Sequence, residues 1–327
     1  MPPPRANVLT HGHCMDGLAS AVLFTRLLDV IEPSRRLSMS YRSCGYGPKL
    51  KSIPGGWLSG EVNAILDFRY AEDDRVTYFF DHHKTGFASP REEQTARERV
   101  AASGGRRSLF FDATCSSCAK LIQRVAKDSY GAALPGDPTL VEWADRVDSA
   151  RFDDPEVAFF AREPALVLAD VVERHGDTPF LARVVPELIA RTVAEVVASE
   201  EIAGRAAPLA AMKEAYLTAL RTSGSMRGDV AVADLSAGGP TPAGKFATYV
   251  AFPSCRYSVV LLRTPDQLKL SVGYNPWSGK ERGHDIAALC QREGGGGHAV
   301  VGAANFAHAE LATARAALAR VVASLQT

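Results

Sequence analysis

Short apolar runs alternate with segments of helical periodicity in the first half of the chain. Four runs, several of them rich in β-branched or aromatic residues, predict strands at residues 6–10, 37–41, 62–66 and 76–80. After the first run, apolar residues from Leu18 to Ile31 recur at roughly helical spacing until Pro33. A further helix is predicted through Val125, with Thr114 as its cap. This alternation predicts an α/β fold in which a mostly parallel sheet is covered by helices on both faces.

The second half begins with a long helical stretch and returns to strands. The pattern is helical from about 138 to 220, and its Ala-, Val- and Glu-rich part is predicted to bridge two domains, with a hinge at 223–228. Strands are predicted at 229–235, 246–252, 257–263 and 267–273, and helices from about Asp285 and His308. We therefore expect an N-terminal domain (1–190), a helical linker (191–226) and a smaller C-terminal α/β domain with a mixed sheet (227–327).

Composition and charge narrow the choice of ligand. The 327 residues have room for about two domains, and 46% hydrophobic with 23% charged residues is an ordinary globular composition. Lys and Arg together number 37, as do Asp and Glu, so the formal net charge is +0. Proteins that hold long nucleic acid usually carry a basic excess. Small or short anionic ligands are therefore expected, unless positive charge is concentrated in one cleft.

Neither a membrane segment nor a zinc or redox role of the C-x-x-C pair is expected. No apolar run approaches the ~18 residues of a membrane span, and the N-terminus lacks the apolar core of a signal peptide. A cytoplasmic protein without a membrane partner is the expectation. The six cysteines are scattered, and Cys115 with Cys118 forms a lone C-x-x-C, interpreted as two small residues on a helix.

The residues that could perform chemistry follow predicted strands. They are, in chain order, His11 and Asp16 after the first strand, Asp67 after the third, Asp81-His82-His83 after the fourth, and the helical pair Asp145 and Asp148. Each alone is commonly a cap, a turn residue or part of a solvated face, but their joint occurrence favours a metal site, because ligands of α/β sheets bind outside the carboxyl ends of the strands. Carboxylates with imidazoles suit Mn²⁺, and Mg²⁺ less well because of the histidines.

A second candidate site lies near the C-terminus. Gly294–Gly297 are followed by His298, and glycine runs bring backbone N–H groups close to anions. A flexible loop is the alternative interpretation. A metal site and a phosphate site on separate parts of the chain indicate a two-domain enzyme of phosphoryl chemistry.

The order of these motifs resembles the DHH phosphoesterase superfamily with its glycine-rich DHH-associated domain, over nearly the whole chain. The matching segments are His11–Ser20 for the first motif, Asp67 and Asp145 for the isolated aspartates, Asp81-His82-His83 for the signature triplet, and Gly294–His298 with Ala303 and Phe306 for the GGGH box. By size and layout the chain is most similar to the stand-alone oligoribonuclease or nanoRNase type, which also includes nucleotide phosphatases.

The resemblance implies a role for each matching residue. Two Mn²⁺ ions, or Mg²⁺, would be held by His11, Asp16, Asp67, His82 and Asp145. Asp67 would bridge the ions, Asp81 would orient His82, and His83 would face the scissile phosphate. The substrate would be bound by Gly294, Gly295, Gly296, Gly297, His298 and Arg282, with Lys280 and Arg292 as alternatives to Arg282, because an arginine common in relatives is absent at Gly273.

The first motif departs from the common pattern of two aspartates separated by one residue. Cys14 stands in place of the first aspartate and His11 is shifted by one, so the segment is more similar to a branch with H-x-x-C-x-D-G. Cys14 is either a metal ligand or a packed residue beside the site, since a thiolate would favour zinc. His13 is an extra ligand or a surface residue, and Asp148 is a further ligand or part of a solvated helix face.

These observations predict a metal-dependent phosphoesterase that hydrolyses short oligonucleotides or small phosphorylated nucleotides by two-metal activation of water. One alternative is a pyrophosphate or polyphosphate hydrolase. Another is a non-catalytic nucleotide-binding protein on a degenerate site, which Cys14 favours and the remaining ligand set opposes. The sequence leaves open the choice of RNA, DNA or nucleotide, the number of metals, and whether the protein is a homodimer.

Overall fold

The chain forms two compact units in the computed structural model, which describes residues 3–45 and 53–326. The first unit contains the chain up to Arg151 together with Glu163–Ala206. The second contains Phe152–Arg162 together with the chain from Ala207 onward. Helix α9 (Glu200–Ser223), in the segment predicted as a linker, contributes residues to both units. The hydrophobic pattern does not reveal that Phe152–Arg162 belongs to the second unit.

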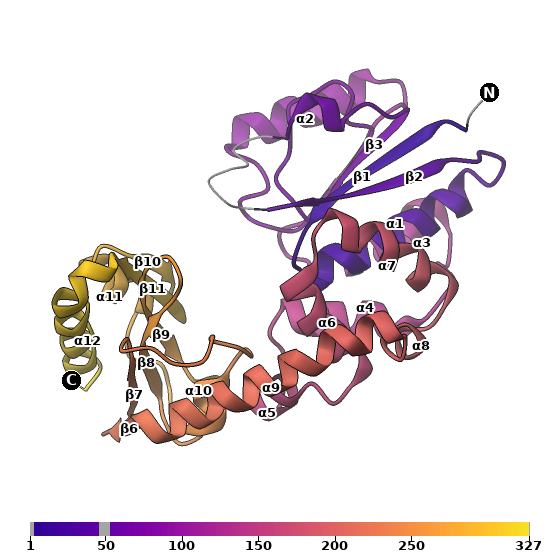
Figure 1. Ribbon diagram of the computed structural model, residues 1–327. Helices are drawn as coiled ribbons and strands as arrows, with labels where there is room; N and C mark the ends of the chain where they lie inside the picture. Colours follow the sequence, from indigo (N-terminus) through magenta and orange to yellow (C-terminus); the bar gives the residue numbers. More distant parts are fainter. Residues whose placement is uncertain (1–2, 46–52, 327) are drawn as a thin grey trace. The chain divides into compact units, whose positions relative to one another are not determined.

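The first unit is built on a five-stranded sheet in the order β2-β1-β3-β4-β5, in which every neighbouring pair is parallel (Figure 1). The strands are β1 (Arg5–His11), β2 (Ser38–Cys44), β3 (Val62–Leu66), β4 (Tyr78–Asp81) and β5 (Ser108–Phe111). The predicted parallel sheet is confirmed, and its first four strands overlap the predicted runs. Strand β5 was not predicted, because four residues are too few to show a period.

Helices cover both faces of this sheet. They are α1 (Met15–Ile31), α2 (Pro90–Ala102), α3 (Cys118–Tyr130), α4 (Pro138–Asp148), α6 (Pro164–His175), α7 (Thr178–Ala190) and α8 (Val193–Val197), with a 3₁₀ turn η1 (Gly55–Trp57). Phe24 of α1 packs against Phe80, with ring centroids 6.0 Å apart. The neighbouring Phe79 belongs instead to a cluster with Ala96 of α2. Successive residues of a strand face opposite sides, so α1 and α2 lie on opposite faces.

The cap of helix α3 lies three residues after the predicted one, Thr114. The Ser117 hydroxyl accepts a hydrogen bond from the backbone N–H of Lys120 at 3.2 Å and so caps the helix. The Thr114 hydroxyl instead donates to the Asp112 carboxylate at 2.6 Å. The backbone between Thr114 and Ser117 is thereby left outside the helix, and it becomes important for the site.

The second unit is a six-stranded mixed sheet in the order β10-β11-β9-β8-β7-β6. Its strands are β6 (Gly224–Arg227), β7 (Val230–Leu235), β8 (Tyr257–Arg263), β9 (Leu268–Tyr274), β10 (Gly296–His298) and β11 (Val301–Phe306). Only β7 and β8 pair in parallel. The helices are α5 (Pro155–Phe160), α10 (Ala247–Ala251), α11 (Ile286–Arg292) and α12 (Leu311–Leu325), with 3₁₀ turns η2 (Pro276–Ser278) and η3 (His308–Glu310).

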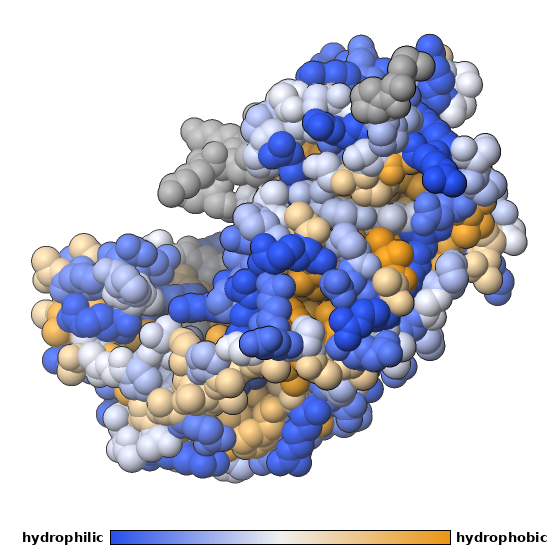
Figure 2. All heavy atoms as spheres, turned by 45° about the vertical axis from the view of Figure 1, so that its right-hand side comes forward, coloured by the Kyte–Doolittle hydropathy of each residue, from blue (hydrophilic) through white to orange (hydrophobic). Residues whose placement is uncertain are grey.

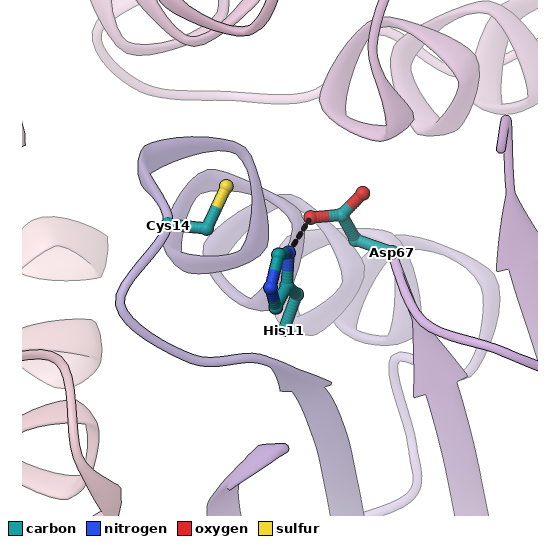
Figure 3. Close-up of side chains that lie close together, drawn as sticks. All are labelled: His11, Cys14 and Asp67. Atoms are coloured by element: carbon teal, nitrogen blue, oxygen red, sulfur yellow. Dashed lines mark ion pairs between the residues drawn. The ribbon is translucent and has the colours of Figure 1, made fainter. Parts of the chain in front are cut away.

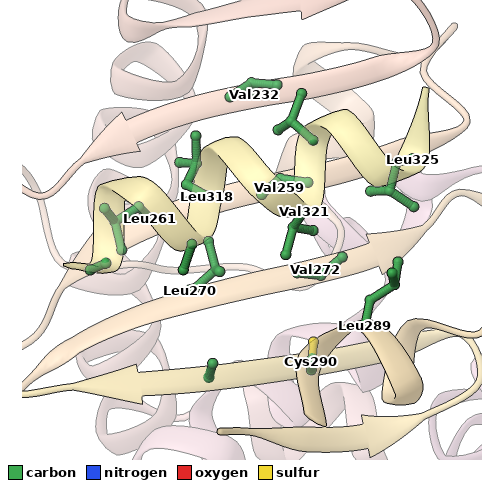
Figure 4. Packing of buried hydrophobic residues seen from close by; sticks show 14 of the residues in the cluster. Val232, Val259, Leu261, Leu270, Val272, Leu289, Cys290, Leu318, Val321 and Leu325 are labelled. Carbon is green, nitrogen blue, oxygen red and sulfur yellow. The ribbon is translucent and has the colours of Figure 1, made fainter. Parts of the chain in front are cut away.

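Hydrophobic residues fill both faces of the second sheet. On one face α12 lays Leu318 and Val321 over the strand residues Val259 and Leu261 (Figure 4). On the other face, Leu220 of α9 and the fully buried Phe159 of α5 pack against a second set of strand residues. The predicted mixed sheet with helices is confirmed.

Two local predictions in the second unit were wrong. Residues 246–252, predicted as a strand, contain the short helix α10, which begins after Phe246 in a left-handed conformation (φ 64°). The segment predicted as a hinge contains β6, which pairs with β7, and a turn at Gly228 (φ 58°). In both segments local composition was outweighed by packing on the sheet.

No helix among residues 3–45 and 53–326 is long and apolar enough to cross a membrane. The most buried long helix, α1, is enclosed by its own unit, where Arg26 donates a hydrogen bond to the Leu188 carbonyl at 2.8 Å. In Figure 2, hydrophobic residues appear as separate patches on a largely hydrophilic face.

Candidate metal centre

The site lies where the order of the parallel sheet reverses. Strand β1 stands between β2 and β3, so the connections from these strands leave in opposite directions and open a crevice at the carboxyl ends of β1 and β3. His11 is the last residue of β1, and Asp67 follows β3 directly. Asp81 ends the next strand, β4, and is followed by His82 and His83. The topology therefore brings together residues that are up to 72 positions apart (His11 to His83).

Asp67 has the most unusual environment in the site. Its backbone is left-handed (φ 54°), a conformation that is uncommon outside glycine, although Asp and Asn adopt it more readily than other residues, and that clusters at active sites. Its side chain is fully buried, and neither carboxylate oxygen accepts a hydrogen bond from the described residues. The oxygens lie instead 3.7 Å from His11 Nδ1 and 3.5 Å from His82 Nε2. Burial alone would raise the pKa of Asp67, but interactions with His11 and His82 outweigh it and lower that pKa.

The first motif wraps tightly around the end of β1. Thr10 donates from its hydroxyl to the Gly17 carbonyl at 2.7 Å, and a Cβ atom on Gly17 would lie 2.0 Å from the carbonyl oxygen of His11. Only glycine permits this approach of α1 to β1. The turn brings the Cys14 thiol to His11 and Asp67, and these three side chains offer ligand atoms within 4.8 Å of one another (Figure 3).

Asp16 is held by the N-terminus of α3. Its two oxygens accept hydrogen bonds from the backbone N–H groups of Cys118 at 2.7 Å and Ala119 at 2.9 Å. The partial positive charge of a helix N-terminus stabilises a carboxylate at this position. Complete burial nevertheless raises the pKa of Asp16, together with the nearby charges of Asp67 and Asp148.

His82 is oriented by a backbone carbonyl. Its Nδ1 lies 3.1 Å from the carbonyl oxygen of Cys115, which leaves Nε2 facing three carboxylates: Asp148 at 3.4 Å, Asp67 at 3.5 Å and Asp16 at 3.7 Å. A hydrogen bond of this kind fixes the tautomer of a metal-binding histidine. Burial lowers the pKa of His82, but the three carboxylates outweigh it and raise the pKa to about 10. The site therefore has a surplus of negative charge that a cation would neutralise.

His83 is oriented by Asp81. The Oδ1 atom of Asp81 lies 2.8 Å from His83 Nδ1 and also accepts the backbone N–H of His82 at 2.9 Å. This hydrogen bond raises the pKa of His83. The resemblance implied that Asp81 orients His82, whereas the structure places the Asp81 carboxylate against the His83 ring. Gly86 makes room for the pair, because a Cβ atom there would lie 2.1 Å from Asp81 Oδ2.

The structure separates the two acids of α4. Asp148 joins the cluster, forming with Asp16 and His82 a group whose ligand atoms lie within 4.8 Å. Asp145 points elsewhere: its carboxylate accepts a 2.5 Å hydrogen bond from the Ser116 hydroxyl and forms ion pairs with Lys120, at 3.1 Å, and with Arg151. Asp145, implied as a ligand by the resemblance, is therefore not brought to the cluster.

The segment from Cys115 to Ala119 supports the whole site, and sequence reasoning missed it. Its backbone contacts His82 through one carbonyl and Asp16 through two N–H groups, and its Ser116 side chain bonds Asp145 on α4. The C-x-x-C pattern thus marks a structural segment whose main contribution is its backbone. Backbone contacts leave no mark on residue type, so the sequence offered no signal for this role.

The donor set fits divalent cations. Three groups of ligand atoms lie within 4.8 Å: His11, Cys14 and Asp67; Asp67, His82 and His83; and Asp16, His82 and Asp148. Asp67 belongs to two of these groups, which suits a ligand shared by two ions. Carboxylates and imidazoles fit Mn²⁺ best, and the Cys14 thiol, whose pKa is raised by burial and by Asp67, adds a softer donor. Such an ion would satisfy the two buried Asp67 oxygens, which accept no hydrogen bond from the described residues.

His13, the glycine run and Arg282 lie outside this cluster. His13 has a left-handed backbone (φ 55°), and its ring lies 3.1 Å from the carbonyl oxygen of Glu173. In the second unit Gly296–His298 form the edge strand β10, paired with β11, so the glycine run is not a loop over its whole length. Arg282 is exposed in the segment before α11.

The four glycines of the run have different reasons to be glycine. A Cβ atom would lie 2.0 Å from the Ala303 oxygen at Gly295 and 2.3 Å from the Val301 oxygen at Gly297, so both are required by the hairpin itself. Gly294 has a positive φ of 77°. Gly296 has neither constraint, and a Cβ atom there would meet no described atom within 4 Å. Its lack of a side chain is therefore not explained by the packing of the unit.

Comparison with known proteins identifies the fold. No protein-family model and no curated protein matches the sequence. Among solved structures, the chain is similar to the pGpG-specific phosphodiesterase PggH from Vibrio cholerae, with a TM-score of 0.69, 18% identity, and 98% of this chain and 99% of that chain covered. A DHH domain from a member of the S1p family of ribosomal proteins gives a TM-score of 0.56 at 13% identity, covering 99% of this chain and 87% of that chain.

A third similar structure contains a metal ion. The chain is similar to RecJ from Thermus thermophilus in complex with Mn²⁺, with a TM-score of 0.51, 13% identity, and 98% of this chain but 52% of that chain covered. These likenesses extend over nearly the whole of this chain. The chain therefore has the fold of the DHH-domain proteins, as its motifs predicted.

Proposed function

We propose that this protein is a metal-dependent phosphoesterase that hydrolyses short oligonucleotides or small phosphorylated nucleotides. The observation that carries the proposal is Asp67, a fully buried carboxylate with a left-handed backbone that is surrounded by imidazoles and accepts no hydrogen bond from the described residues. The shared fold supports the reaction class, because the similar structures include a pGpG-specific phosphodiesterase and RecJ.

The residues proposed to hold the metal are His11, Asp16, Asp67, His82 and Asp148, with Cys14 as a further donor. Asp148 takes the place of Asp145 in this set. The Asp148 carboxylate lies 3.4 Å from His82 Nε2, whereas the Asp145 carboxylate pairs with Lys120. The cation is proposed to be Mn²⁺ or Mg²⁺, and the similar RecJ structures contain one or the other. A bound cation neutralises charge on the phosphoryl oxygens and lowers the pKa of an attacking water.

The remaining residues of the triplet supply the proton for the leaving group. Asp81 bonds His83 Nδ1 at 2.8 Å, which leaves Nε2 of the same ring to face the substrate. This bond raises the pKa of His83, because the Asp81 carboxylate stabilises the protonated ring. We infer that His83 Nε2 donates its proton to the leaving oxygen, and that Asp81 stabilises the positive ring until then.

The first prediction tests the reaction class and the need for metal. Purified protein should release phosphate or mononucleotides from a panel of dinucleotide, 3′,5′-bisphosphate and cyclic dinucleotide with Mn²⁺, and should lose this activity in chelator. Asp67→Asn should bind less metal in elemental analysis and lose most turnover. Preference for pyrophosphate over every nucleotide would favour the polyphosphate hydrolase instead, and tight nucleotide binding without turnover would favour a binding protein.

The second prediction separates the two acids of α4. Asp148→Asn should weaken Mn²⁺ binding by at least about 10–100-fold, the loss typical even of residues that only support a ligand. Asp145→Asn is the matched control, and it should weaken binding less than Asp148→Asn, because the Asp145 carboxylate contacts Ser116, Lys120 and Arg151 and reaches the ligands only through the segment 115–119. Isothermal titration of the metal-free protein with Mn²⁺ measures both. Greater weakening in Asp145→Asn would restore that residue as the ligand.

The third prediction distinguishes the two histidines of the triplet. His82→Ala should lower bound metal, because Nε2 faces the three carboxylates. His83→Ala should keep at least the metal held by Asp16 and Asp148 and yet lose turnover by roughly 10²–10⁴-fold, as expected for a lost proton donor. A leaving group that needs no proton, such as nitrophenolate, should reduce the His83→Ala defect. An equal defect with both leaving groups would contradict the role of His83.

The fourth prediction concerns nucleotide binding by the glycine run. A Cβ atom at Gly296 would meet no described atom within 4 Å, so we expect Gly296→Val to leave the hairpin intact and to act through the ligand. KM for a dinucleotide should rise strongly with little change for a nitrophenyl phosphate ester, and metal content should stay unchanged. Gly239→Val, at an equally open position of the same unit, is the control. Equal losses for both substrates would show that the run does not bind the nucleotide.

A further inference from the structure

The two oxygens of the Asp67 carboxylate face different side chains. Oδ2 lies 3.7 Å from Nδ1 of His11, whereas Oδ1 lies 3.5 Å from Nε2 of His82 and 3.7 Å from Nδ1 of His83. Neither oxygen accepts a hydrogen bond from the described residues, although the side chain is fully buried. The carboxylate therefore has one position for a cation on the side of His11 and a second on the side of His82.

Cys14 gives the first of these positions a sulfur donor. Its thiol forms with His11 and Asp67 a group whose ligand atoms lie within 4.8 Å of one another (Figure 3). The group around His82 is completed instead by two carboxylates, one from α1 and one from α4. We call the first group the thiol position (His11, Cys14 and Asp67) and the second the carboxylate position (Asp16, His82 and Asp148, together with Oδ1 of Asp67).

Neither core packing nor helix capping favours a cysteine at residue 14. A free cysteine commonly serves as a small buried hydrophobic residue. Four of the six cysteines in this chain are buried, but Cys14 is partly exposed. It stands at the N-cap of α1 in an extended conformation (φ −136°), where Ser, Thr, Asp and Asn are the favoured residues. Its place beside a buried carboxylate and an imidazole is therefore the feature that a thiol suits.

The turn that carries Cys14 is fixed at each of its residues. The Gly12 N–H donates to a carbonyl at the end of β2 at 2.7 Å, and the His13 N–H donates to the Gly176 carbonyl at 3.1 Å. The Cys14 carbonyl accepts the Leu18 N–H at 3.1 Å in the first turn of α1. A ligand whose backbone is held in this way is already placed before a cation binds.

The donor atoms decide which cation each position prefers. Thiolate and imidazole ligands select Zn²⁺ and related thiophilic cations, whereas carboxylates suit Mg²⁺ and Mn²⁺. Three protein ligands of the kind found at the thiol position, with a further place for water, are typical of catalytic zinc sites. A cysteine that binds a cation releases its thiol proton to the solvent. The two positions therefore differ in the chemistry of their ligands, although they share Asp67.

We propose that the centre binds two different cations, a thiophilic cation of the Zn²⁺ class at the thiol position, through the sulfur of Cys14, and Mn²⁺ or Mg²⁺ at the carboxylate position. This inference rests on the proposed function, whose metal centre it specifies. Cys14 is then the residue that determines which cation the thiol position selects, and a carboxylate in its place makes the two positions alike.

The first experiment uses Co²⁺, which takes the place of Zn²⁺ and has an absorption spectrum that reports its ligands. Metal-free protein titrated with Co²⁺ should develop the near-ultraviolet charge-transfer band of a thiolate bound to cobalt. Cys14→Ser should lose this band. Cys115→Ser is the matched control and should keep it, because Cys115 is the other partly exposed cysteine and contacts His82 through its backbone carbonyl.

The second experiment offers Zn²⁺ and Mn²⁺ together to the metal-free protein and counts the bound ions by elemental analysis. The wild type should bind one ion of each kind. Cys14→Asp should bind Mn²⁺ at both positions, and its affinity for Zn²⁺ should fall by at least about 10-fold, the smallest loss typical of a changed ligand environment. Cys14→Ser should still bind Mn²⁺ at the carboxylate position, which shows that the unit remains folded.

Other results contradict the two-cation centre. A wild type without the band, or a Cys14→Ser variant that keeps it, would show that this sulfur is not a ligand. Equal affinity of the wild type and Cys14→Asp for Zn²⁺ would show that the sulfur does not select the cation. These measurements use no substrate. If the protein hydrolyses no nucleotide but shows the predicted spectra and ion counts, the proposed function fails and the two-cation centre stands.

Discussion

The structure of the first unit depends on the burial of one negative charge. The Asp67 carboxylate is removed from water and accepts no hydrogen bond from the described residues, an arrangement that costs several kcal/mol unless opposite charge is close. His11 and His82 approach it from the two neighbouring strands, and the reversal of strand order at β1 makes their approach possible. The tight turn at Gly17 and the left-handed backbone of Asp67 are locally unfavourable conformations, and the packing around them holds them in place.

The same constraint explains why backbone groups dominate around the site. Several carboxylates crowd the crevice beside the two histidines. The hydrogen bonds that these side chains still need come from backbone N–H and C=O groups, which are uncharged and fixed in direction. The N-terminus of α3 serves Asp16 in this way, and the Cys115 carbonyl serves His82. Asp145, tied to Ser116, fastens this segment to α4. Rigidity of residues 115–119 is therefore a condition for the ligand geometry.

Strand-end residues were predictable, whereas helical and backbone contributions were not. Parallel strands end at one edge of the sheet, so His11, Asp67 and His82 had to meet once the strands were recognised. Asp145 and Asp148 lie one turn apart on α4, and only packing decides which of them reaches the cluster. Four residues of β5 carry too little pattern, and residues 246–252 follow a helical path because of the surrounding sheet. The family resemblance supplied the order of motifs but not these local choices.

The segment Phe152–Arg162, which belongs to the second unit but lies between two segments of the first, affects folding during synthesis. Phe159 is fully buried in the core of the second unit and its carbonyl accepts a hydrogen bond from Lys213 at 2.8 Å, yet it precedes Glu163–Ala206 of the first unit in the chain. During synthesis this apolar segment emerges long before the strands that cover it. It stays exposed to solvent or to a chaperone until Glu163–Ala206 of the first unit and then the strands of the second unit have been synthesised. Neither unit can therefore be obtained whole by cutting the chain at a single position.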